Sequence, residues 1–118
     1  MFVENLLIFL PATSITISNS VTTVGDMAFY WCTALTSIDV ENANANYSSI
    51  DGVLFDKEKT ILIWYPAKKT NSSYVVPNSV TTIGDYAFMT CTVFFSRVSI
   101  IAFSYRFLFQ RQINTKIL

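Results

Sequence analysis

A short alternation of apolar and polar residues marks the first patterned stretch of the chain. Residues 14–18 read SITIS, so two isoleucines are separated by small polar side chains. Successive side chains of a strand point to opposite faces, and this pattern therefore predicts a short strand with one buried face. Similar triplets stand at 38–40 and at 74–76. The chain thus repeats one kind of strand at intervals.

A longer repeat surrounds these strands. Segments 19–33 and 78–92 read NSVTTVGDMAFYWCT and NSVTTIGDYAFMTCT, identical at eleven of fifteen positions with a constant offset of 59. In each segment a glycine precedes an aspartate, Asp26 or Asp85, which is typical of the cap of a short helical turn. We expect the Ala-Phe pair that follows to face inward. Because capping accounts for both aspartates, no catalytic role follows from the pair.

The spacing between the first two strands, in the low twenties, is typical of a solenoid of the leucine-rich kind. One such coil cannot bury its apolar face alone, so neighbouring coils must stack to form a core. The sequence therefore predicts a β-rich α/β solenoid. Its leucine-rich-repeat-like coils would combine short parallel strands with short helical turns.

Residues 42–66 lengthen one of the coils. The dipeptide Asp51-Gly52 is typical of a tight hairpin turn, which predicts paired strands on either side of it. A polar turn and an apolar strand over 60–65 follow. We therefore expect an ordinary coil that carries an inserted β-hairpin, and insertions of this kind often lie on the binding face of a repeat protein.

The two cysteines occupy equivalent repeat positions, Cys32 and Cys91. Two strand spacings would separate them by about 10 Å. A disulfide requires Cα atoms within about 7 Å of each other. We expect both to be buried free thiols.

Two segments resemble the BspA-type leucine-rich repeat: NSVTTIGDYAF, which a cysteine follows, and ALTSIDV. This repeat is found in surface proteins of gut and oral bacteria and of trichomonad protists. The resemblance covers residues 12–92, and 42–66 is similar to the insert typical of these proteins. It implies a non-catalytic module of a longer cell-surface or secreted protein, with a protein partner such as a host-cell or matrix protein. A structural spacer, or a decayed fragment without binding activity of its own, stays an alternative.

Both ends of the chain depart from the repeat. Residues 1–11 supply no full coil, and their apolar run lacks the basic residue that precedes the core of a signal peptide. Residues 93–118 contain four basic and no acidic side chains, whereas 1–92 contain four basic and eight acidic ones. This break indicates either a different module or a change of reading frame. We expect membrane contact only if the 93–118 tail is genuine.

Composition narrows the function classes. The chain has 118 residues, of which 52% are hydrophobic and 14% charged. Eight Lys and Arg balance eight Asp and Glu, so no net charge attracts nucleic acid. Histidine, the commonest general base and metal ligand, is absent. We therefore expect neither an enzyme nor a cofactor or metal site.

Aromatic residues in and beside the insert are the candidate partner contacts, because Tyr and Trp anchor many interfaces. These candidates are Tyr47, Phe55, Trp64, Tyr65 and Tyr74. The alternative is that alternate members pack inward while the others cover the sheet. Asn46 and Asn71 each begin an N-glycosylation triplet, although such triplets also arise by chance in Asn- and Ser-rich sequence.

Overall fold

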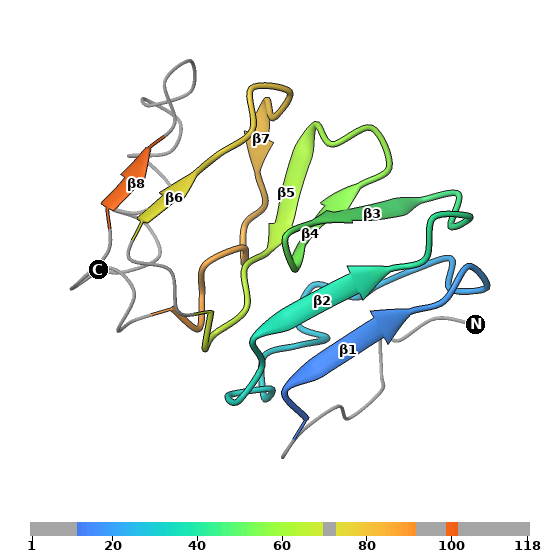
Figure 1. Ribbon diagram of the computed structural model, residues 1–118, viewed down its shortest axis with the longest axis horizontal. Coiled ribbons are helices and arrows are strands. Elements are labelled where there is room, and N and C mark those ends of the chain that lie inside the picture. The colour runs from blue at the N-terminus through green and yellow to red at the C-terminus, as the bar shows by residue number, and fades with distance from the viewer. Residues whose placement is uncertain (1–11, 70–72, 92–98, 102–118) are drawn as a thin grey trace.

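The computed structural model describes residues 12–69, 73–91 and 99–101. Eight short strands make up the regular structure of these residues, and they form three small sheets (Figure 1). In chain order they are β1 (Ser14–Ile17), β2 (Ser37–Val40), β3 (Tyr47–Ile50), β4 (Val53–Asp56), β5 (Ile61–Trp64), β6 (Ser73–Val75), β7 (Thr82–Ile83) and β8 (Ser99–Ile101). The described residues include no helix long and apolar enough to cross a membrane.

Parallel strand pairs form the two ends of the molecule. β1 pairs with β2 in a register that places Ile15 opposite Ile38, one repeat of the sequence apart. β6 pairs with β8, with Ser73 opposite Ser99. Figure 1 shows the two pairs on opposite sides of a central sheet. Strands of successive repeats therefore lie side by side, as a leucine-rich-repeat-like fold requires.

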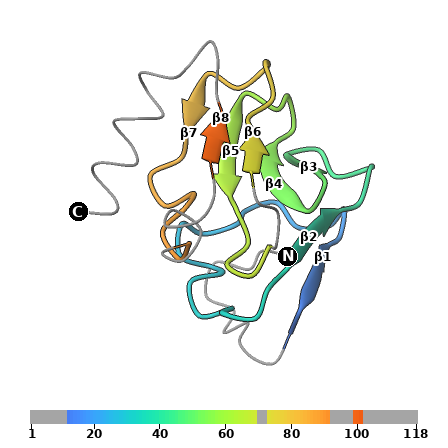
Figure 2. The same cartoon turned by 60° about the vertical axis from the view of Figure 1, so that its left-hand side comes forward.

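The central sheet has the strand order β3-β4-β5-β7, in which the insert supplies β3, β4 and β5 and the second 15-residue repeat supplies β7. β3 and β4 are antiparallel and joined by Asp51 and Gly52, which adopt left-handed φ angles of 50° and 82°. This geometry matches the right-handed twist of a hairpin and is the one that an Asp-Gly turn favours. The predicted hairpin is confirmed. Figure 2 shows β1 and β2, in blue to teal, at one side of this sheet.

The segments after β1 and β6 are runs of turns. The Ala28 amide donates to the Gly25 carbonyl and the Cys32 amide to the Phe29 carbonyl, both at 3.1 Å. The same pattern recurs at 84–91. Each bond spans three residues and the bonds skip positions, so they do not form the continuous ladder of an α-helix. The expected helical turns, and with them the α/β character of the coils, are not confirmed in the described part of the chain.

Two clusters of buried side chains form the core, and β4 contributes to both. Leu54 packs into the cluster that contains Phe29 and Trp64, whereas Val53 and Phe55 pack into the other cluster. These three side chains of β4 are fully buried. Burying an apolar side chain of this size contributes about 1.5–3 kcal/mol. The inserted strand therefore joins the two halves of the core.

Both cysteines are buried free thiols, as expected from their spacing. Burial raises the pKa of Cys32, and it raises the pKa of Cys91 to about 12. The Cys91 thiol donates to the Tyr65 carbonyl at 3.4 Å. The two thiols are therefore held in the unreactive protonated form at neutral pH.

Candidate functional site

Three of the five aromatic candidates lie in the core. Phe55 and Tyr65 are 0% exposed and Trp64 is 2% exposed. The Trp64 ring lies 6.0 Å from that of Phe29, and the Tyr65 ring lies 5.4 Å from that of Phe88. This burial favours the interpretation in which these aromatic residues pack inward. Their role in partner binding stays an untested prediction.

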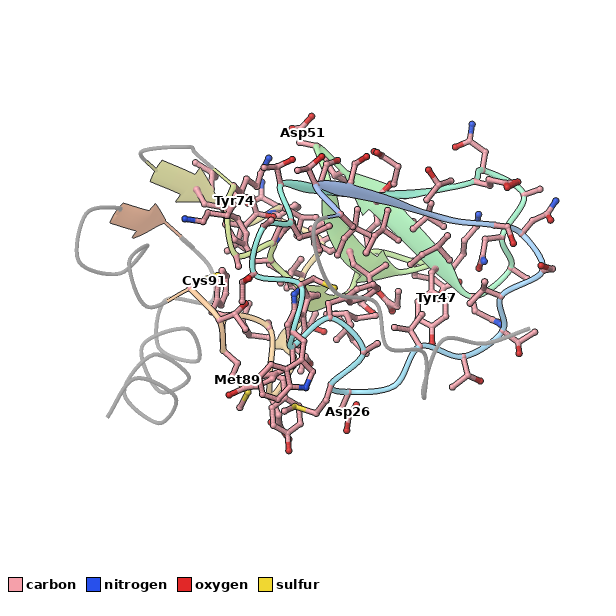
Figure 3. The ribbon with its side chains drawn as sticks, turned by 90° about the horizontal axis from the view of Figure 1, so that it is seen from below. Asp26, Tyr47, Asp51, Tyr74, Met89 and Cys91 are labelled. Atoms are coloured by element: carbon pink, nitrogen blue, oxygen red, sulfur yellow. The ribbon has the colours of Figure 1, made fainter. Side chains whose placement is uncertain are left out.

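Tyr47 and Tyr74 are half-buried and lie apart from each other (Figure 3). The Tyr74 ring packs edge-on against Tyr65 at 4.9 Å, and burial raises the pKa of Tyr74 above its ordinary value. The Tyr47 hydroxyl accepts a hydrogen bond from the Val24 amide at 2.9 Å. Tyr47 therefore links the insert to the turn segment of the preceding repeat.

One of the two glycosylation candidates can be placed. Asn46 is exposed, and its side-chain amide donates to the Thr22 carbonyl at 3.0 Å. Asn71 lies outside the described residues. A glycan on Asn46 would replace one of its two amide hydrogens. Glycosylation at Asn46 stays a prediction.

Asn44 is a structural residue that the sequence analysis missed. It is 0% exposed, and its Nδ2 donates to the carbonyls of Ser18 and Val21 at 2.9 and 3.0 Å. Its Oδ1 accepts the amides of Asn46 and Tyr47, each at 2.8 Å. Asn44 thereby fixes the start of β3 to the preceding repeat and orients Tyr47.

A cavity of about 280 Å³ lies between the two repeated Gly-Asp turns. The two turns and the insert supply its lining: Val24 and Asp26, then Gly84, Asp85 and Tyr86, then Tyr47, Ile61 and Ile63. Asp26 and Asp85 were expected to cap helical turns. That expectation is not confirmed in the described residues, because hydrogen-bonded turns and no helix follow either aspartate. Both aspartates are instead exposed at the cavity.

The most exposed aromatic side chain of the described part lies five residues after Asp26 in the chain. Trp31 is 64% exposed and packs edge-on against Tyr30 at 4.8 Å, while Met27, which follows Asp26 in the chain, is 44% exposed. We call Met27, Tyr30 and Trp31 the aromatic turn. At these three positions the two 15-residue repeats differ most, because the second repeat has Tyr, Met and Thr there. That divergence is the signal that sequence analysis could have used.

No metal site is apparent in the part of the chain that the structure describes. Within 12–69, 73–91 and 99–101, no three Cys, Asp or Glu side chains are grouped so that they could hold an ion. The cavity offers carboxylates, aromatic rings and an apolar wall.

Comparison with known proteins places these features in a family. A family model described as the BspA type leucine-rich repeat region (6 copies) matches residues 9–72 and 67–103. The chain belongs to this family. The BspA-type match runs past Cys91 to residue 103 and so includes β8. The proposed boundary near residue 92 and the nature of the 93–118 tail stay predictions.

Two solved structures of other proteins are similar to this chain in fold. The pneumococcal vaccine antigen PcpA is 41% identical over 64% of this chain, with a TM-score of 0.60. A leucine-rich repeat protein from Eubacterium ventriosum is 32% identical over 75% of this chain, with a TM-score of 0.61. The chain spans 18% and 25% of the lengths of these two proteins. No curated protein gives a significant match.

Proposed function

We propose that this chain is a non-catalytic, protein-binding repeat module of a cell-surface or secreted protein, and that it mediates adhesion to a host-cell or matrix protein. Membership of the BspA-type family supports a repeat module. The relative PcpA is described as a vaccine antigen, and a vaccine antigen must be accessible to antibodies. The proposal therefore places the parent protein at the cell surface or outside the cell.

The observation that carries this proposal is the exposure of the aromatic turn. Several positions that are identical in both repeats serve the shared fold, as the buried Phe29 and Cys32 do. The aromatic turn breaks that identity with Trp31 and Met27, whose side chains remain in contact with solvent. Trp, Tyr and Met are enriched at protein interfaces, and Trp is prominent among the residues that dominate binding energy. The aromatic turn therefore has the composition and the exposure of a contact surface.

Attachment of the full chain to immobilised fibronectin, laminin and collagen, and to cultured epithelial cells, tests this proposal. We expect saturable attachment to at least one of them, weakened about tenfold or more by Trp31→Ala, as for a hot-spot residue. Val75→Ala is the matched control, because Val75 is 53% exposed on β6 and lies outside the aromatic turn. It should leave attachment unchanged.

Other outcomes would contradict parts of the proposal. Attachment that survives Trp31→Ala but is lost when residues 46–69 are replaced would move the contact to the insert. A folded chain that attaches to none of these surfaces would favour the structural spacer.

A further inference from the structure

The cavity between the repeated turns has walls that are fixed by hydrogen bonds. On one side the Val24 amide donates to the Tyr47 hydroxyl at 2.9 Å. On the other side the Gly84 amide donates to the Leu62 carbonyl at 2.8 Å, and β5 continues that contact by pairing with β7. A ligand therefore meets a preformed site, which reduces the entropy that binding would cost.

The lining of the cavity combines apolar and acidic side chains. Ile61 and Ile63 are two residues apart on β5, so they line the same face of the strand. Tyr47 and Tyr86 add aromatic rings to this apolar surface. The rim carries the carboxylates of Asp26 and Asp85, which come from equivalent positions of the two repeats.

Within the part of the chain that the structure describes, no basic side chain pairs with the rim carboxylates. Neither Asp26 nor Asp85 makes an ion pair or side-chain hydrogen bond with another described residue. Two of the four lysines of the described part are engaged elsewhere, Lys57 with the Asn42 carbonyl and Lys69 with the Asp51 carbonyl. Residues 12–69 and 73–91 contain seven acidic side chains and these four lysines, so acidic side chains outnumber basic ones there. The cavity therefore favours a cation that also has an apolar portion.

We propose that this cavity receives an arginine side chain of a protein partner, an inference that rests on the proposed protein-binding function. The aliphatic stem of arginine would lie along Ile61 and Ile63, because long basic side chains bury their stems on apolar surface. The guanidinium would pair with Asp26 and Asp85 and stack on the tyrosine rings, for which its planar geometry is suited better than an ammonium group. The partner is thus a protein that presents an exposed arginine side chain.

Amide NMR titration of the full chain with the peptide acetyl-Gly-Arg-Gly-amide tests this inference. We expect saturable shifts of the Asp26, Asp85 and Tyr86 amides, with a Kd on the order of 1 mM, as for a single side chain. The peptide with citrulline, a neutral analogue of arginine of the same shape, should give no saturable shifts, and the lysine peptide should bind more weakly than the arginine peptide. Raising the salt concentration from 50 to 500 mM should weaken binding severalfold.

Charge-neutralising variants separate local pairing from the overall charge. Asp26→Asn and Asp85→Asn should each raise the Kd at least about threefold, since each removes one charged partner of the guanidinium. Asp51→Asn is the matched control: it removes the same charge, and Figure 3 shows Asp51 on the opposite side of the molecule from Asp26. Its Kd should match that of the unaltered chain.

Several results would overturn the inference. The citrulline peptide could give the same shifts as the arginine peptide, or the lysine peptide could bind more tightly than the arginine peptide. The arginine peptide could give no saturable shift, or Asp51→Asn could raise its Kd as much as Asp26→Asn and Asp85→Asn do. Attachment to a matrix protein without a response to arginine would refute the arginine site and leave the protein-binding function standing. An arginine response without attachment to any tested surface would do the reverse.

Discussion

Replacing Asn44 with alanine should destabilise the fold more than any other single polar substitution in the insert. The Asn44 side chain makes four hydrogen bonds at 2.8–3.0 Å that join two repeats. Alanine can make none of them. The Val21 carbonyl loses its partner in a buried environment, whereas the other three groups are partly reached by water.

The magnitude follows from these environments. A buried carbonyl without a partner costs about 1–3 kcal/mol, and each of the other bonds contributes about 0.5–1.5 kcal/mol. Since such terms are not fully additive, we expect Asn44→Ala to lower the free energy of unfolding by at least about 3 kcal/mol. A small domain has only about 5–15 kcal/mol of stability in total.

Urea unfolding followed by circular dichroism measures this loss as a shift of the midpoint at constant m-value. Asn42→Ala is the control, because Asn42 is exposed and only its backbone carbonyl is used, by Lys57. It should change stability by less than about 0.5 kcal/mol. A loss below about 1 kcal/mol for Asn44→Ala, or a loss equal to that of the control, would refute the reasoning.

Three further expectations concern the hairpin, its second turn and the thiols. Gly52→Ala should lower the free energy of unfolding in urea by about 2 kcal/mol or more, because the left-handed φ of 82° disfavours a side chain and the new Cβ would lie 2.7 Å from the Ser37 hydroxyl. Adding Ser37→Ala should recover part of that loss. A loss near zero for Gly52→Ala would contradict the geometry. Burial alone would raise the pKa of Asp56, but hydrogen bonds from the Thr60 hydroxyl and from the Ile61 and Thr60 amides hold it below its ordinary value. The ionised carboxylate therefore stabilises the fold above the unfolded pKa of about 4, and this stability is lost as the pH falls through the lower folded pKa. The stability difference between the unaltered chain and Asp56→Asn should shrink between pH 6 and pH 2, and a constant difference would count against the effect. Both cysteines should resist a thiol reagent at pH 8 until urea unfolds the chain, after which two thiols react. Rapid labelling of the folded chain would contradict the burial of the thiols.

Local chemistry explains what the sequence predicted well. The Asp51-Gly52 turn requires two left-handed residues in succession, and few dipeptides other than Asp-Gly and Asn-Gly provide them. The short strands follow from the alternation of apolar and polar residues. The equivalent positions of the two cysteines likewise predicted their burial without a disulfide.

Long-range packing explains what the sequence predicted less well. Three successive apolar residues, Val53 to Phe55, make up most of β4, and the sequence does not show that its two faces pack into different core clusters. The Gly-Asp-x-Ala-Phe spacing fits both a helical turn and a run of three-residue turns. Only the packing of the Ala-Phe pair in the assembled core selects the turns.

The candidate contact surface was missed for a different reason. Partner contacts were predicted among the aromatic residues in and beside the insert, because insertions often lie on the binding face of a repeat protein. Trp31 stands where the second repeat has Thr90, so a comparison of the differences between repeats would have selected it. No comparison of the repeats would have selected Asn44, because its four hydrogen-bond partners come together only in the folded chain.

The solvent exposure of the two tryptophans, measured with and without a partner, tests the central claim most directly. The chain contains two tryptophans, Trp31 at 64% exposure and Trp64 at 2%. In the full chain labelled with 5-fluorotryptophan, we expect two fluorine resonances, of which only that of Trp31 shifts between H₂O and D₂O. When a matrix protein to which the chain attaches is added, the solvent response of Trp31 should disappear while Trp64 stays unresponsive. A Trp31 resonance that still responds to solvent in the complex would contradict the claim that the aromatic turn is the contact surface.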